Sequence, residues 1–105
     1  MIVRISRASV REGQEESFER FIRERGVPLV RKQKGIREIV HGWELVGDGR
    51  VYFFVSVWET LEDVQRFAGP NWRNSVVLPE EDKLVVEMTC EHYETLGAGA
   101  PPIPA

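Results

Sequence analysis

The sequence predicts an α+β fold in which the elements follow the order strand, helix, strand, strand, helix, strand. Segments rich in β-branched residues alternate with segments whose apolar residues recur at helical spacing. A Gly47-Asp48-Gly49 turn joins the two central strands into a hairpin. A chain of 105 residues has room for one domain. We expect that domain to span residues 1–96, followed by a flexible tail rich in proline and glycine over residues 97–105.

The first strand and the first helix are predicted from a change in period. The first nine residues alternate, with Val3 and Ile5 on the face opposite Arg4. From Glu12 onward, apolar residues recur at helical spacing among glutamate and arginine residues, which is typical of an amphipathic helix. Pro28 lies inside this pattern and predicts a kink or break just before it.

Two strands follow the first helix. Residues 36–46 form the second strand, in which Ile39, His41 and Trp43 share a face, and residues 51–58 form the third. The third strand is apolar on both faces. One face carries Val51, Phe53, Val55 and Val57, and the other carries Tyr52, Phe54 and Trp58.

A second helix and a fourth strand complete the pattern. Thr60 is a favourable N-cap residue, with Asp63 three positions later, and Gly69-Pro70 ends the helix. A polar and aromatic connection follows, and residues 84–95 form the last strand.

This order of elements is the ferredoxin-like βαββαβ arrangement, a four-stranded antiparallel sheet with both helices on one face. Two helices cover only one face of a sheet whose third strand is apolar on both. Leaving the second face in water would forgo about 25 cal/mol for each Å² of apolar surface. A second copy of the sheet is the simplest cover, so we predict a homodimer joined through the sheet face.

Composition and charge exclude several classes of protein. The net charge is −3 and the pI is near 5.4, and basic residues are interleaved with acids, so we expect no nucleic-acid binding. No apolar run is long enough to span a membrane. Because Cys90 is the only cysteine and the first residues do not resemble a secretion leader, we expect a cytoplasmic location.

The sequence resembles the antibiotic-biosynthesis-monooxygenase-like family of dimeric α+β barrels over residues 2–94. The resemblance is carried by Phe54-Val55-Ser56-Val57-Trp58-Glu59-Thr60-Leu61-Glu62-Asp63, Phe67, Gly69-Pro70, Trp72 and the closing Glu91-His92-Tyr93-Glu94. It implies two sheets packed into a shared barrel, with a pocket in each subunit between the sheet and the helices. This agrees with the packing argument.

The resemblance also implies a range of activities. Some members oxidise aromatic substrates with oxygen and no metal or flavin, and others act on quinols or degrade haem. The haem-degrading members use an Asn, a Trp and a His where this chain has Ser6 or Arg7, Phe67 and Val77, so we do not expect haem degradation. We predict a cofactor-independent monooxygenase for a small aromatic or quinol-type molecule. The alternative is a non-catalytic homodimer that binds a small molecule or is purely structural.

The two histidines are the candidate catalytic bases, because imidazole titrates near neutral pH. His92 lies late in the last strand, and we expect that strand end to lie near Tyr52, so that the pair binds and deprotonates a phenol or quinol. Alternatively, His92 only hydrogen-bonds a neighbour at a strand edge or at the dimer interface. His41 either lines the pocket or is a core histidine with its hydrogen bonds satisfied.

The connection after the second helix holds the candidate substrate-binding residues. Trp72 lies between Asn71 and Arg73, where a loop aromatic could close over a flat ligand while the guanidinium meets an anionic oxygen. Alternatively, Trp72 only covers the end of the helix. The sequence has no metal-ligand spacing, no phosphate-binding glycine loop and no nucleophile elbow, so we expect no metal and no cofactor.

Overall fold

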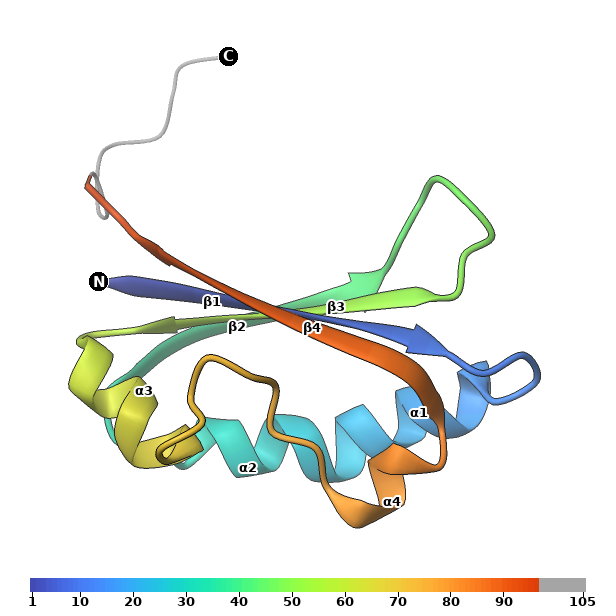
Figure 1. The fold of residues 1–105 in the computed structure, drawn as a ribbon, viewed down its shortest axis with the longest axis horizontal. Coiled ribbons are helices and arrows are strands. Elements are labelled where there is room, and N and C mark those ends of the chain that lie inside the picture. The colour runs from blue at the N-terminus through green and yellow to red at the C-terminus, as the bar shows by residue number, and fades with distance from the viewer. Residues whose placement is uncertain (97–105) are drawn as a thin grey trace.

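The structure is a computed structural model that describes residues 1–96 (Figure 1). The predicted tail over residues 97–105 lies outside the described residues. In chain order the elements are β1 (Ile2–Val10), α1 (Glu15–Phe21), the π-helical turn η1 (Ile22–Gly26), α2 (Val27–Arg31), β2 (Ile36–Trp43), β3 (Val51–Trp58), α3 (Leu61–Ala68), α4 (Pro79–Asp82) and β4 (Val85–Glu94).

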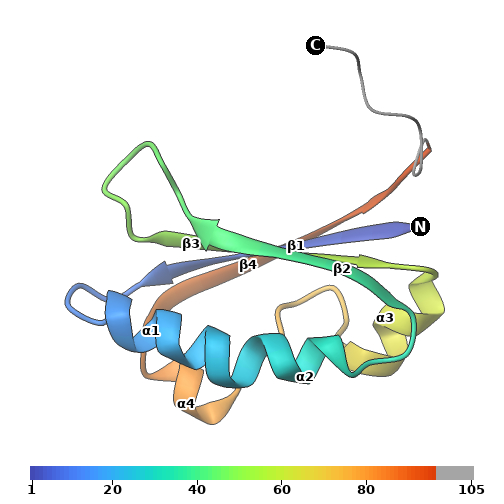
Figure 2. The same cartoon turned by 180° about the vertical axis from the view of Figure 1, so that it is seen from behind.

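The four strands form one antiparallel sheet in the order β2-β3-β1-β4. All helices lie on one face of this sheet, as Figures 1 and 2 show from opposite sides. The predicted ferredoxin-like α+β fold is therefore confirmed. None of the helices within residues 1–96 combines the length and the apolar character needed to cross a membrane.

The first helix differs from the predicted kinked or broken helix. Helical backbone runs from α1 through η1 into α2 without a break (Figure 2), and the Val27 N–H donates to the carbonyl of Ile22 in the wider π-helical pattern. Pro28 follows inside this continuous helix, where it cannot donate the usual backbone hydrogen bond. The wider turn therefore accommodates the proline within a continuous helix.

Two further boundaries differ from the predicted ones. β2 ends at Trp43 rather than at residue 46, and the hairpin segment leaves Leu45 and Val46 exposed. The short helix α4 was not predicted. It starts with Pro79, and the Glu81 carboxylate accepts a hydrogen bond from the Leu78 N–H, as in a helix N-terminal cap.

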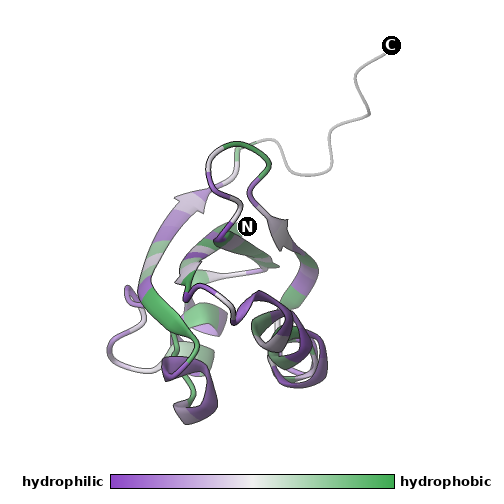
Figure 3. Cartoon of the chain, turned by 90° about the vertical axis from the view of Figure 1, so that its right-hand side faces the viewer, coloured by the Kyte–Doolittle hydropathy of each residue, from purple (hydrophilic) through white to green (hydrophobic). Residues whose placement is uncertain are grey.

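The core lies between the helices and one face of the sheet. Phe18 from α1, Trp58 from β3 and Val64 from α3 are the most deeply buried large side chains. The Thr60 hydroxyl accepts a hydrogen bond from the Asp63 N–H, which confirms the predicted N-cap of α3. Along the strands, hydrophobic and hydrophilic residues form alternating bands (Figure 3).

The opposite face of the sheet, which we call the outer face, is not covered by residues 1–96. Its centre consists of Val3 and Ile5 from β1 and of the predicted valine and phenylalanine set of β3, Val51, Phe53, Val55 and Val57. Val40 on β2 is 46% exposed and Tyr93 on β4 is 52% exposed. The Arg7–Glu91 ion pair adds a polar edge to this apolar surface.

Candidate functional site

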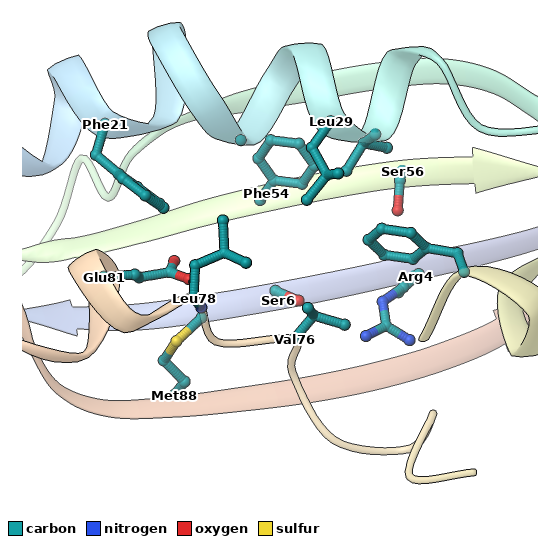
Figure 4. Close-up of a pocket in the computed structure, with 13 residues that line it drawn as sticks. Arg4, Ser6, Phe21, Leu29, Phe54, Ser56, Val76, Leu78, Glu81 and Met88 are labelled. Carbon is teal, nitrogen blue, oxygen red and sulfur yellow. The ribbon is translucent and has the colours of Figure 1, made fainter. Parts of the chain in front are cut away.

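A cavity of about 80 Å³ lies between the helix-covered face of the sheet, the continuous helix of α1, η1 and α2, and the connection that leads into α4 (Figure 4). Its wall is mainly apolar and includes the aromatic rings of Phe21, Phe54 and Phe67. The polar residues of the wall are Arg4, Ser6, Ser56 and Glu81. Apolar walls with a few polar groups are typical of small-molecule sites, so this cavity is the candidate site.

Arg4 brings a positive charge to the cavity from the centre of the sheet. It is only 4% exposed. Its Nη1 donates to the Trp72 carbonyl at 2.7 Å and to Nε2 of His92 at 2.9 Å, and its Nη2 donates to the Asn74 carbonyl at 3.0 Å. Among residues 1–96, no acidic side chain forms an ion pair with it. Burial lowers the pKa of Arg4, although a guanidinium in a protein stays protonated.

His92 is the cross-strand neighbour of Arg4, because β4 pairs with β1 in the register that places these residues side by side. Burial lowers the pKa of His92, and the charges of Arg4 and Arg73 lower it further. His92 is therefore neutral at pH 7. Because Nε2 accepts the hydrogen bond from Arg4, we assign the remaining ring proton to Nδ1.

The connection between α3 and α4 contacts the sheet at Arg4 and His92. The Trp72 ring meets the His92 ring edge to face, with 5.0 Å between centroids, and the Arg73 guanidinium lies 4.4 Å from the centre of the Trp72 ring. Asn71 is exposed, and its carbonyl accepts a hydrogen bond from the Asn74 N–H in a turn. Three predicted site residues, His92, Trp72 and Arg73, thus gather around Arg4.

His41 and Tyr52 meet at a different place, on β2 and β3. Nδ1 of His41 lies 2.5 Å from the Tyr52 hydroxyl, and Tyr52 packs edge-on against Phe18 and Trp43. Burial is the largest cause that raises the pKa of Tyr52. The predicted shared face of Ile39, His41 and Trp43 is confirmed by the β2–β3 register.

The expected proximity of His92 to Tyr52 is wrong. The start of β1 pairs with the end of β4 on one side and with the end of β3 on the other, so His92 lies opposite Arg4. Tyr52 begins β3 and lies opposite Ala8, near the far end of β1. Antiparallel pairing through a shared central strand therefore separates the two residues along the sheet.

Glu81 is a site residue that the sequence analysis missed. It is 5% exposed, and burial raises its pKa to about 7. The carboxylate accepts a hydrogen bond from the Leu78 N–H at 3.3 Å. Figure 4 shows Glu81 and Arg4 toward opposite ends of the cavity. A carboxyl group with this pKa can accept or donate a proton near neutral pH.

The six predicted site residues are not part of the described cavity wall. His92 contacts Arg4, and Trp72 and Arg73 pack beside His92, so these three residues lie next to the cavity wall at Arg4. His41 and Tyr52 contact each other elsewhere on the sheet, on β2 and β3. Residues 1–96 contain no group of three or more His, Cys, Asp or Glu side chains arranged to hold a metal ion. The titratable residues that border the cavity are Arg4 and Glu81.

The fold and the cavity define a small α+β protein with a mainly apolar cavity between its sheet and its helices. The chain belongs to the antibiotic biosynthesis monooxygenase family, whose family model matches residues 1–75. Among curated proteins, none matches the chain.

Solved structures with the same fold include a candidate antibiotic biosynthesis monooxygenase from Deinococcus radiodurans, with a TM-score of 0.73, 13% identity and full coverage of both chains. A candidate antibiotic biosynthesis monooxygenase from Bordetella bronchiseptica has a TM-score of 0.72 and 20% identity over 90% of this chain and 96% of its own. A single-site mutant of MhuD, solved with two manganese protoporphyrin IX molecules in each active site, has a TM-score of 0.69 and 16% identity with full coverage of both chains. At these identities the likeness shows the fold alone.

Proposed function

We propose that the protein is a cofactor-independent monooxygenase that acts on a small aromatic or quinol-type molecule. The single observation that carries this proposal is the apolar cavity with a buried carboxyl group whose pKa is about 7. An oxygenation that uses the substrate's own anion needs a water-poor pocket, a base and donors that stabilise the anion. Glu81 is the proposed base and Arg4 the proposed donor.

The proposed reaction starts when Glu81 removes a proton from an acidic C–H or O–H group of the substrate. The resulting anion transfers an electron to oxygen, and an oxygen–carbon bond forms. For a CH₂ group, one oxygen atom becomes the carbonyl oxygen of the product. The other oxygen atom leaves as water with the two hydrogens of that CH₂ group, so the substrate supplies both electrons for this water. For a quinol, one oxygen atom replaces a ring hydrogen to give a hydroxyquinone, and the other leaves as water with two hydrogens of the quinol.

The histidines stay candidates with other roles in this proposal. His92 donates no proton to Arg4 but fixes the guanidinium by accepting its N–H, so it would position the anion-binding group. His41 would act on a ligand only if the ligand reached β2, where Nδ1 of His41 contacts the Tyr52 hydroxyl. Asn71, Trp72 and Arg73 would contact a ligand that extends from the Arg4 end of the cavity.

The cavity sets a limit on the substrate. Its volume of about 80 Å³ is smaller than the engineered apolar cavity of roughly 150 Å³ that accepts benzene. A single aromatic ring would therefore move side chains of the wall, of which Leu29, Val76 and Met88 are only half-buried. The same limit favours the second candidate function, a non-catalytic protein that binds a smaller molecule.

We also propose that two copies assemble through the outer face and that the protein is cytoplasmic. The outer face offers a continuous apolar centre from β1 and β3. The β2–β3 hairpin extends beyond the sheet on the side of the outer face (Figure 1), and in it Leu45 is 98% exposed and Val46 is 80% exposed. A second sheet laid against this face would cover both features.

Oxygen uptake tests the proposed activity. Protein treated with a chelator is mixed with a panel of hydroquinones and anthrones in an oxygen electrode, and products are analysed after reaction in ¹⁸O₂. We expect catalysed uptake of one O₂ per substrate and one labelled oxygen atom in an anthrone product. Absence of catalysed uptake across the panel, with tight binding of a panel member, would instead favour the non-catalytic function.

A further inference from the structure

Arg4 carries a buried charge that residues 1–96 do not neutralise. The hydrogen-bond acceptors around it are the two carbonyl oxygens of Trp72 and Asn74 and the neutral imidazole of His92. The Phe67 ring lies 6.0 Å from its guanidinium carbon. Buried charges in proteins are normally paired with an opposite charge, because burying an unpaired ion is costly.

The guanidinium also has hydrogen-bonding capacity to spare. A guanidinium has five N–H donors, and three of them make the hydrogen bonds described above. The N–H of Nε and one N–H of Nη2 have no hydrogen-bond partner among residues 1–96. Because Arg4 lines the cavity, these are the donors that remain for a ligand bound there.

The surroundings select the kind of anion. The charge of Arg4 is permanent, so it is best neutralised by a group that is already ionised before any proton transfer. A carboxylate has two oxygens that match neighbouring guanidinium N–H groups. Ser56, the cross-strand neighbour of Arg4, and Ser6 add two hydroxyl groups to this part of the wall. The rest of the wall is mainly apolar and includes the rings of Phe54 and Phe67, which suits a flat ring.

We propose that the cavity binds a small aromatic carboxylate, with the carboxylate on Arg4 and the ring among the apolar side chains of the wall, which move to admit it. This inference rests on the proposed function for treating the cavity as the substrate site, and it narrows the substrate class to aromatic acids. It assigns to Arg4 the carboxylate of the substrate in place of the anion formed by proton transfer. Because Glu81 and Arg4 lie toward opposite ends of the cavity, Glu81 would remove a proton from a ring substituent of the ligand whose carboxylate is bound to Arg4.

Binding of a matched pair of probes tests the inference. Benzoate and its neutral isostere benzamide are titrated into the full-length protein under anaerobic conditions, with heat of binding as the readout. We expect benzoate to bind at least about tenfold more tightly than benzamide, since a charge-assisted bidentate pair contributes more than one neutral hydrogen bond. Equal affinities, or no binding of either probe, would overturn the inference.

Variants test whether Arg4 binds the carboxylate, separately from its hydrogen bonds to the connection between α3 and α4. Arg4→Met should abolish the preference for benzoate, and Arg4→Lys should reduce it, whereas Arg20→Met removes an exposed arginine from α1 and should leave it unchanged. A folded Arg4→Met protein that still prefers benzoate would contradict the inference. If Arg4→Met does not fold, the Arg4→Lys variant and the wild-type preference decide.

Two further outcomes separate this inference from the proposed function. A preference for 4-nitrophenolate over benzoate would overturn the assignment of a carboxylate. Tight benzoate binding without oxygen uptake by any hydroxylated aromatic acid would support the carboxylate site and contradict the proposed oxidation. Oxygen uptake with neutral quinols and no preference for benzoate would support the proposed oxidation and contradict the carboxylate site.

Discussion

Nη1 of Arg4 lies 2.9 Å from Nε2 of His92, and the two residues are cross-strand neighbours on the helix-covered face of the sheet. A permanent cation therefore uses a neutral imidazole as a hydrogen-bond acceptor. This pairing requires His92 to stay unprotonated, and it connects the last strand with the wall of the cavity.

The pair predicts an unusual titration of His92. Burial, then Arg4 and then Arg73 lower the pKa of His92 below its ordinary value of 6.5. In Arg4→Met, the pKa should rise toward 6.5 because one of the two charges is removed. NMR titration of the imidazole protons measures both values. A wild-type pKa above 6.5 would contradict the assigned hydrogen bond.

Glu81 predicts a loss of stability as the pH rises. The pKa of its carboxyl group is about 7 in the folded protein, against an ordinary value of 4.5. Between these values the unfolded chain releases a proton that the folded protein retains, so stability falls with increasing pH, by up to about 3 kcal/mol. Urea unfolding at several pH values should show this slope in the wild type.

Two substitutions isolate the contribution of Glu81 to that slope. Glu81→Gln should flatten the slope between pH 4.5 and 7 and should be more stable than the wild type at pH 8. Glu80→Gln keeps the Glu81 carboxyl but removes a neighbouring charge that contributes to its raised pKa, so its slope should be only slightly shallower than that of the wild type. The assignment of a buried carboxyl would be wrong if Glu81→Gln kept the wild-type slope.

Gly35 predicts a local steric requirement. Its φ is +87°, and a Cβ there would lie 2.2 Å from the carboxyl carbon of Asp63, which is buried. Gly35→Ala should lower the free energy of unfolding by about 2–4 kcal/mol. Gly13 has a similar φ of +83° and no atom within 4 Å, so Gly13→Ala should lose about 1 kcal/mol. Chemical denaturation of both variants measures the difference, and equal losses would refute the clash.

The outer face predicts the oligomeric state. Val55→Lys places a charge in the centre of the apolar face and should convert a dimer into a monomer. Val77→Lys makes the same change on the exposed connection and should remain dimeric. Light scattering at micromolar concentration measures both masses, and a monomeric wild type would contradict the proposed assembly.

The fold was predictable because its signals are local. The third strand is predicted with its observed ends, and the Thr60 cap is visible as a short motif. The end of β2 was not predictable, because Leu45 and Val46 are as apolar as strand residues and yet lie exposed in the hairpin. The π-helical turn depends on how the helix accommodates Pro28, which periodicity does not indicate.

The site was less predictable because it depends on tertiary contacts. Alternation places Arg4 opposite Val3 and Ile5, but it does not say that the helices cover the Arg4 face. Glu81 is one of three consecutive acids in α4, and the sequence does not show which of them turns inward. The gathering of His92 with Trp72 requires the sheet register, which the expected His92–Tyr52 proximity had misjudged.

In the proposed reaction, the Glu81 carboxyl acts as the base of an oxidation inside the cavity. The most direct measurement is the rate of oxygen uptake by wild type, Glu81→Gln and Glu80→Gln with the hydroxylated aromatic on which the wild type is most active. We expect Glu81→Gln to lose about 10²–10⁴-fold in rate, the range typical of a missing general base. Glu80→Gln keeps the Glu81 carboxyl and removes only a neighbouring charge, so it should lose far less. A folded Glu81→Gln protein with the wild-type rate would contradict the claim.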